Sequence, residues 1–391
     1  MQTSRKSNKA IGSSRQLTEP RKAMPKKGGK DKAPKASDLG TLVQGALSGE
    51  VNTVKTVLKR GLPVESQDAG GNHALGAACC GGNIAVVQLL LDAGAPLELK
   101  NGIGTTPLWL AAGYGHLDVL NLLIEKGCDI NEGNTTQDTP MLAAAAKRHT
   151  VVVQRLLEAG ARHMTVNKNG DSPLSLAVSD SNTEMARILL GQPGAAMLLR
   201  RKNAKGVHPM AAAVTRSNVE LVQLLLESGG SVTETDANGA TPLALAAFCG
   251  ATDVVKLLVA TDDVVLEAKD PSGATPLWLT AAAGHDGALA VLLEAGANPH
   301  VSSGGFSAVV AAGRNGFPKC KALLAACPAA IMDAAATATT GPAQPQPQSQ
   351  PGSSPVAAAD EDDDWIPDGN FDVPDGEDVF DPARGKDYVY Q

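Results

Sequence analysis

The sequence predicts an all-α solenoid in which one helix-turn-helix unit recurs along the chain. The first observation is a proline that returns at steps of 33, 33, 36, 33 and 34 residues, at positions 107, 140, 173, 209, 242 and 276. The second is that each proline lies within Thr-Pro-Leu or a near-copy of it. The third is an apolar content of 43% with only 3% aromatics, so the core must consist of Ala, Leu and Val. A period of this length is typical of a solenoid, whose function usually lies in an extended surface.

The elements of one unit follow from local signals between Asn101 and Gly133. Thr106 is a suitable N-cap, and Pro107 stands in the first helical turn, where its missing N–H costs nothing. This short helix is expected to end at Gly113 or Gly115. A second helix is expected over Leu117–Lys126, and the glycine after it is suited to a C-terminal cap. Neither helix can bury its apolar face alone, so each unit must stack on its neighbours.

These residues resemble the ankyrin repeat, with its turn, T-P-L-H-x-A helix, second helix and Gly-Ala return loop. We count nine units and interpret the first and last as caps; in the first, Leu39–Gln67, only the second helix is clear. No unit keeps the family's histidine after Thr-Pro-Leu. The fifth unit contains Gly191-Gln192-Pro193-Gly194, and a proline there should end the helix and loosen the stack over Gly191–Arg201.

Composition divides the chain into four parts. Residues 1–37 are expected to be a disordered basic arm, and residues 38–328 the repeat array, with caps at 38–67 and 302–328. Residues 329–359 are an Ala/Pro/Gln linker, and residues 360–391 are expected to be a disordered acidic tail that contains aromatics. The arm carries eleven Lys/Arg against two acidic residues, a net charge of +9. The tail carries twelve Asp/Glu against two basic residues, a net charge of −10. The array itself is expected to be only mildly acidic, with charge concentrated at the two ends.

Catalytic chemistry is not indicated. The chain lacks GxxxxGK[ST] and HExxH motifs, and every histidine is explained by its place in the repeat; His116, His149 and His285, for example, share one position. We therefore expect no enzyme, with no catalytic residues, cofactor or metal. The six cysteines show no CxxC spacing and are expected to be buried thiols. No apolar stretch is long enough to span a membrane, and no secretory signal is evident.

The resemblance implies that the hairpin tips and the C-terminal ends of the first helices face a partner. Carried over to this sequence, the partner-binding candidates are Ile103, Tyr114, Lys147, Asp180, Lys205, Arg216, Asn238, Phe248 and Arg314. Tyr114 and Phe248 are favoured as hot spots because exposed aromatics often dominate interfaces. Trp109 and Trp278 lie one helical turn earlier and are expected to pack between repeats.

The tail is expected to be a recognition segment, because its acidic residues are interleaved with Trp365, Phe371 and Phe380. It is also a candidate for docking on its own array. A 31-residue linker has a root-mean-square span of about 30 Å, which favours the last three units, Phe248 to Arg314.

The sequence thus indicates a monomeric protein-interaction scaffold or adaptor in the cytoplasm or nucleus. The groove would hold one protein partner, and the tail would make a second contact or mask the groove. The alternative is a nucleic-acid- or chromatin-associated regulator anchored by the basic arm, for which we expect only weak, non-specific contact with polyanions.

Overall fold

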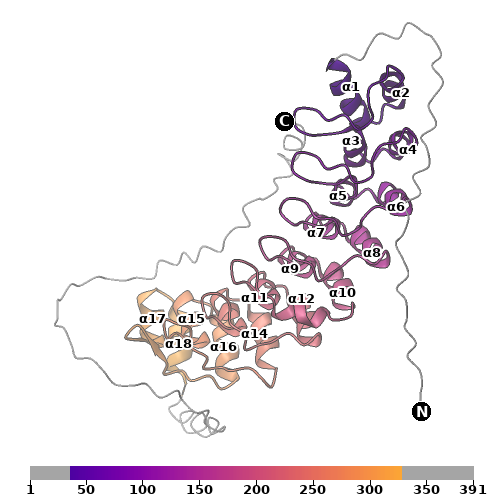
Figure 1. Cartoon of the computed structure of the whole chain (residues 1–391). Coiled ribbons are helices and arrows are strands. Elements are labelled where there is room, and N and C mark those ends of the chain that lie inside the picture. The colour runs from indigo at the N-terminus through magenta and orange to yellow at the C-terminus, as the bar shows by residue number, and fades with distance from the viewer. Residues whose placement is uncertain (1–35, 328–391) are drawn as a thin grey trace, which may run out of the picture.

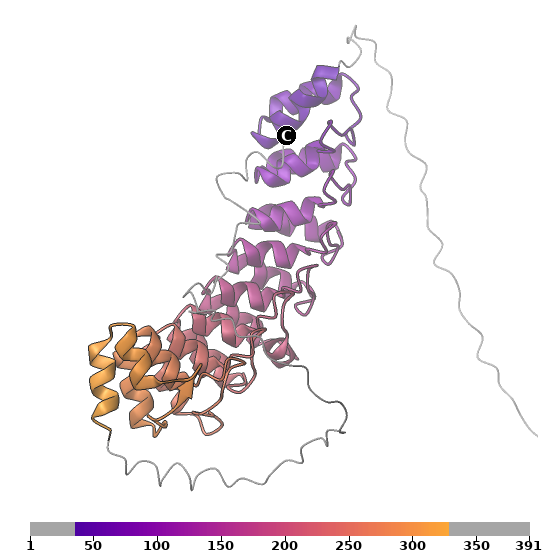
Figure 2. The same ribbon diagram turned by 90° about the vertical axis from the view of Figure 1, so that its left-hand side faces the viewer.

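The computed structural model describes residues 36–327, which form nine helix pairs stacked in a single curved file (Figures 1 and 2). The predicted all-α solenoid is confirmed. The first helices of the pairs form one layer: α1 Ala36–Leu47, α3 Ala74–Cys80, α5 Pro107–Gly113, α7 Pro140–Ala146, α9 Pro173–Ser179, α11 Pro209–Thr215, α13 Pro242–Phe248, α15 Pro276–Ala283 and α17 Ala308–Arg314.

The second helices form the other layer: α2 Val51–Lys59, α4 Ile84–Asp92, α6 Leu117–Glu125, α8 Thr150–Glu158, α10 Thr183–Leu190, α12 Val219–Glu227, α14 Thr252–Val259, α16 Asp286–Glu294 and α18 Pro318–Ala325. Two further elements stand outside the pairs. A 3-10 helix, η1, covers Ala195–Arg200. A two-residue antiparallel ladder joins β1 Ser302–Ser303 to β2 Phe306–Ser307, with Ser302 opposite Ser307.

The recurring phrase starts each first helix as its residues predict. In α5, for example, the Thr106 hydroxyl accepts a hydrogen bond from the Trp109 N–H at 3.2 Å, and Pro107 follows in the first turn. His73 and His208 replace the threonine in two units and perform the same task through Nδ1. A side chain that accepts from an otherwise unpaired N–H stabilises a helix by about 1 kcal/mol.

One hydrophobic core runs through the array from Leu42 to Leu324 and consists mainly of Leu, Val and Ala. Trp109 is buried in this core, and its indole N–H has no hydrogen-bond partner within the described residues. Trp278 is half-buried, and its Nε1 donates to the backbone oxygen of Phe306 in the next unit at 3.0 Å. Both tryptophans therefore pack within the stack, as the sequence indicated.

The first unit is more complete than its sequence indicated. α1 is a twelve-residue helix, and Leu42, Val43 and Ala46 on it are buried. Its pattern was obscured because it lacks the Thr-Pro phrase and contains two glycines. An ion pair of 2.8 Å between Arg60 and Asp38 ties the second helix of this unit to the first.

The extra residues of the fifth unit form η1. α10 ends at Leu190, before Pro193, as expected of a helix that meets a proline. Gly194 then takes a left-handed conformation with φ 79°, and η1 buries Leu198 and Leu199 in the stack. The insertion therefore packs on the common core of the array, and the looser stack expected there stays a prediction. Over residues 36–327, no helix has the length and apolarity needed to cross a bilayer.

Candidate binding surface

From the second to the eighth unit, the hairpin tip is held by an acidic or amide side chain five residues before the N-cap. In the third unit, Asn101 Oδ1 accepts from the N–H groups of Ile103 and Thr105 at 3.2 and 2.9 Å. The same pair of bonds forms at Asp68, Asn134, Asn167, Asn203, Asp236 and Asp270. Such Asx turns fix a hairpin without further support. Sequence reasoning missed this position, although its spacing from the phrase never changes.

Neighbouring tips are joined to one another. The Thr135 hydroxyl donates to the backbone oxygen of Ile103 at 3.0 Å. The Lys168 N–H donates to the oxygen of Thr136 at 3.0 Å, and the Ala204 N–H to that of Asn169 at 2.7 Å. These bonds align the tips as a row, and the side chains of Ile103, Lys168, Lys205 and Asn238 are exposed along it.

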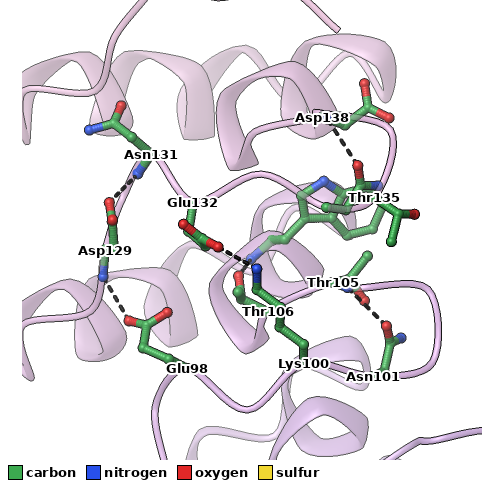
Figure 3. A network of polar contacts seen from close by, with 12 residues as sticks. Glu98, Lys100, Asn101, Thr105, Thr106, Asp129, Asn131, Glu132, Thr135 and Asp138 are labelled. Carbon is green, nitrogen blue, oxygen red and sulfur yellow. Dashed lines mark hydrogen bonds and ion pairs between the residues drawn. The ribbon is translucent and has the colours of Figure 1, made fainter. Parts of the chain in front are cut away.

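The return loops are joined by a second polar network, shown in Figure 3. Glu98 accepts from the Asp129 N–H at 2.8 Å, and Asp129 in turn accepts from the Asn131 N–H at 2.8 Å. Lys100 pairs with Glu132 across the same two units. The Glu98–Asp129 and Lys100–Glu132 contacts join residues 31 and 32 positions apart, so they tie neighbouring units together.

The ends of the first helices form a second row beside the tips. Tyr114, Lys147, Asp180 and Arg216 are the C-caps of α5, α7, α9 and α11, so the structure brings four of the predicted residues to one position in successive units. We call them the helix-end row. The C-cap of α13 is Cys249; Phe248, half-buried, is the last residue of α13 and lies one position before the row in the seventh unit.

The aromatic end of the row is partly open to solvent. Tyr114 is 36% exposed, and its ring stacks on that of His116 with the centroids 6.4 Å apart. Burial of the rest of the side chain raises the pKa of the Tyr114 hydroxyl. Tyr114 is therefore a neutral, fixed aromatic surface at neutral pH.

The middle of the row is charged. Burial raises the pKa of Asp180, although the nearby Arg148 and Arg216 act in the opposite direction. Burial also lowers the pKa of Lys147. These groups have lost part of their hydration, which is the condition under which a bound opposite charge contributes more than at an open surface.

Three residues beside the row have a left-handed backbone conformation that favours glycine. Arg148, Ser181 and Ser217 follow the C-caps of α7, α9 and α11 with φ of 62°, 53° and 53°. Glycine occupies the corresponding position in other units, as at Gly115 with φ 78°. A non-glycine residue in this region costs about 1–3 kcal/mol, and such strain concentrates at functional sites.

The other predicted residues lie elsewhere along the array. Arg314, exposed at the end of α17 in the ninth unit, lies over the Phe306 ring at 4.2 Å from its centroid. Trp365, Phe371 and Phe380 lie outside the described residues. The six cysteines all lie within residues 36–327 and are free thiols. In the same span, no group of three or more His, Cys, Asp or Glu is placed to hold a metal ion.

A family model describing three copies of the ankyrin repeat matches residues 42–134, 132–201 and 193–270. A model of the single ankyrin repeat matches residues 272–303. The chain belongs to the ankyrin repeat family. The predicted resemblance is thereby confirmed over most of the array, and the family's repeats generally mediate protein–protein interaction. No curated protein matches the sequence.

Proposed function

We propose that this ankyrin repeat protein is a non-catalytic scaffold that binds a protein partner along its helix-end row and hairpin tips. The observation that carries the proposal is that Tyr114, Lys147, Asp180 and Arg216 cap the first helices of four successive units, and that Phe248 ends the first helix of the next. Figure 1 shows the long loops between units on the inner side of the curve. Tyr, Phe and Arg are residue types that are enriched at the cores of protein interfaces.

Partner capture by the full chain tests this proposal. Tyr114→Ala with Phe248→Ala removes the two aromatics of the row. The control is Ile84→Ala with Val151→Ala, two exposed apolar side chains on the second helices, 46% and 62% exposed. We expect the first variant to lose a set of captured proteins that the control retains. Equal capture by both variants, at equal thermal stability, would refute the proposal.

The proposal extends to the two ends of the chain. The tail would make a second short contact or mask the row, and the protein would act as a monomer in the cytoplasm or nucleus. One observation favours a second function, in nucleic-acid or chromatin association: the eleven Lys/Arg of residues 1–37. Loss of nucleic-acid binding when residues 1–37 are deleted, with a steep salt dependence before the deletion, would support that function instead.

A further inference from the structure

The array as a whole is mildly acidic, as expected, but charge is sharply segregated within it. Residues 36–146 contain five Lys/Arg and eleven Asp/Glu, a net charge of −6. Residues 147–216 contain eleven Lys/Arg and four Asp/Glu, a net charge of +7. Residues 217–327 again contain five and eleven, a net charge of −6. The middle units are therefore a cationic region between two acidic ones.

Five of these cations lie at the helix ends and hairpin tips, and we call them the cationic strip: Lys147, Arg148, Lys168, Lys205 and Arg216. Lys147 is half-buried and the other four are exposed. Asp180 lies between Arg148 and Arg216 and offsets one of the charges. Asp138 and Asp171, half-buried in the hairpin turns of the same units, offset two more, so the helix ends and tips of these three units retain a net charge of +2.

An aromatic side chain stands at each end of the strip. Tyr114 precedes it by one unit, and Phe248 follows it by one unit. Along the array, the proposed binding surface thus begins with an aromatic residue, is cationic over three units and ends with a second aromatic residue. A complementary ligand is an extended acidic chain that carries aromatic side chains near both of its ends.

The strained residues coincide with the strip. Arg148, Ser181 and Ser217 lie in the three strip units, whereas Gly115 and Gly250 hold the same position on either side. Backbone strain of this kind clusters at functional sites, and one of the three strained residues, Arg148, belongs to the cationic strip.

We propose that the cationic strip and its flanking aromatics bind the chain's own segment 360–391. This inference rests on the proposed function, because it assigns an occupant to the same row. The segment carries a net charge of −10 and contains Trp365, Phe371 and Phe380. The basic arm, residues 1–37, could also neutralise the negative charge of this segment. However, the arm contains no aromatic and few apolar side chains on which Trp365, Phe371 and Phe380 could pack.

The lengths agree. Trp365 and Phe380 are fifteen residues apart, which spans about 50 Å in an extended chain. Tyr114 and Phe248 are four units apart, or about 40 Å at roughly 10 Å per unit.

The number of residues between the array and the tail determines in which direction segment 360–391 runs along the row. Cys327 is followed by 38 residues up to Trp365, with a root-mean-square span of about 35 Å. That span covers the two units back to Phe248 but not the six back to Tyr114. Trp365 is therefore assigned to the Phe248 end and Phe380 to the Tyr114 end. The linker span alone predicted contact with the last three units; the extended segment after Trp365 carries the contact further, to Tyr114.

The consequence is self-occupancy of the binding row. A tethered segment acts at an effective concentration in the millimolar range, so even a weak contact is populated. A partner must then displace the segment and must itself be acidic or bind more tightly. Because the contact is largely ionic and lies at the surface, salt weakens it.

Zero-length crosslinking of lysines to carboxylates in the dilute, full-length protein tests the proposal. We expect crosslinks within one chain from residues 360–381 to Lys147, Lys168 and Lys205, with Lys205 joined to the Trp365 half and Lys147 to the Phe380 half. The variant Lys168→Glu, Lys205→Glu, Arg216→Glu should reduce the Lys147 crosslinks at least fivefold and speed protease cleavage of the segment by a similar factor. The matched control Lys55→Glu, Lys126→Glu, Lys256→Glu should change neither.

Three results would overturn the proposal: crosslinks confined to lysines of residues 1–35, crosslinks only between chains, or cleavage of the segment unchanged by the strip variant. Wild-type crosslinking in high salt supplies a readout that needs no substitution, and it should lose the Lys147 and Lys205 products. Partner capture by a chain ending at Ala359 separates the two claims. If the full-length protein lacks the predicted crosslinks while the truncated chain still captures the partner, the tail docking is refuted and the proposed function stands.

Discussion

The imidazole Nε2 of His149 in the fourth unit lies 3.1 Å from the backbone oxygen of Gly113 in the third. His116 makes the same contact with Cys80 at 2.8 Å, and His285 with Phe248 at 2.9 Å. Because a carbonyl oxygen only accepts, Nε2 carries the proton in each ring. These histidines therefore join consecutive units.

The ring in one unit depends on a glycine in the unit before. A Cβ added to Gly115 would meet the His149 ring at 2.6 Å, whereas one added to Gly160 would meet nothing within 4 Å. Both glycines have positive φ. We predict that Gly160→Ala lowers the free energy of unfolding by about 1 kcal/mol, and that Gly115→Ala lowers it by about 1–3 kcal/mol more, since the ring must move. Denaturant unfolding measures both, and equal losses would contradict the steric argument.

Relief of strain beside the row should stabilise the array. Ser181 has φ 53°, so we predict that Ser181→Gly raises the free energy of unfolding by about 0.5–1 kcal/mol. Ser179→Gly, at the last residue of α9, should instead lower it, by less than the roughly 1 kcal/mol of a helix interior. Arg148→Gly should stabilise like Ser181→Gly but weaken ligand binding at the row. Thermal melts measure the stability of each variant, and binding measurements on the same samples test the effect of Arg148→Gly. No gain in stability from either Ser181→Gly or Arg148→Gly would contradict the prediction.

Stability should fall as the pH is lowered from neutral. Burial lowers the pKa of His73, His149 and His208 below the usual 6.5. The unfolded chain therefore takes up these protons first, and stability is lost as the pH falls below about 6.5 towards the folded pKa values.

A substitution at His208 isolates one of these contributions. His208→Thr keeps an N-cap acceptor and removes the buried imidazole. We predict a shallower decline of the unfolding free energy between pH 7.5 and 5 than in the wild type. His300→Thr, in an exposed return loop, is the control. An unchanged slope in His208→Thr would show that burial of this ring does not set the pH dependence.

The segment after α10 should open more readily than the rest of the stack. η1 has short 3-10 geometry and is preceded by Gly191 and Pro193, which interrupt the regular helix. We predict faster amide exchange over Gln192–Arg201 than over α12, by at least tenfold. Hydrogen–deuterium exchange resolved by peptide measures this directly, and uniformly slow exchange would rule out a hinge.

Much of the fold follows from the sequence because each structural signal is local and repeated. Thr106 and Pro107 are sufficient to place the start of α5, and His208 is recognised as a replacement by position alone. The same regularity places Tyr114, Lys147, Asp180 and Arg216 in one row. The roles of these residues in binding stay predictions.

Other features need the three-dimensional structure. α1 lacks the phrase, so its helix becomes evident only from the burial of Leu42 and Val43 against the next unit. The conformation of Arg148 is a backbone property that its residue type argues against. Gly115 and His149 are 34 positions apart in the sequence, so their close approach becomes evident only when the two units are stacked.

Hydrogen–deuterium exchange of a chain ending at Ala359, with and without a captured protein partner, tests the central claim most directly. The account predicts slower exchange on binding at the helix ends and tips of the inner face, in peptides covering residues 113–116, 146–149, 179–182, 215–218 and 248–251. Slowing confined to the second helices α6, α8, α10 and α12, with those five segments unchanged, would contradict it.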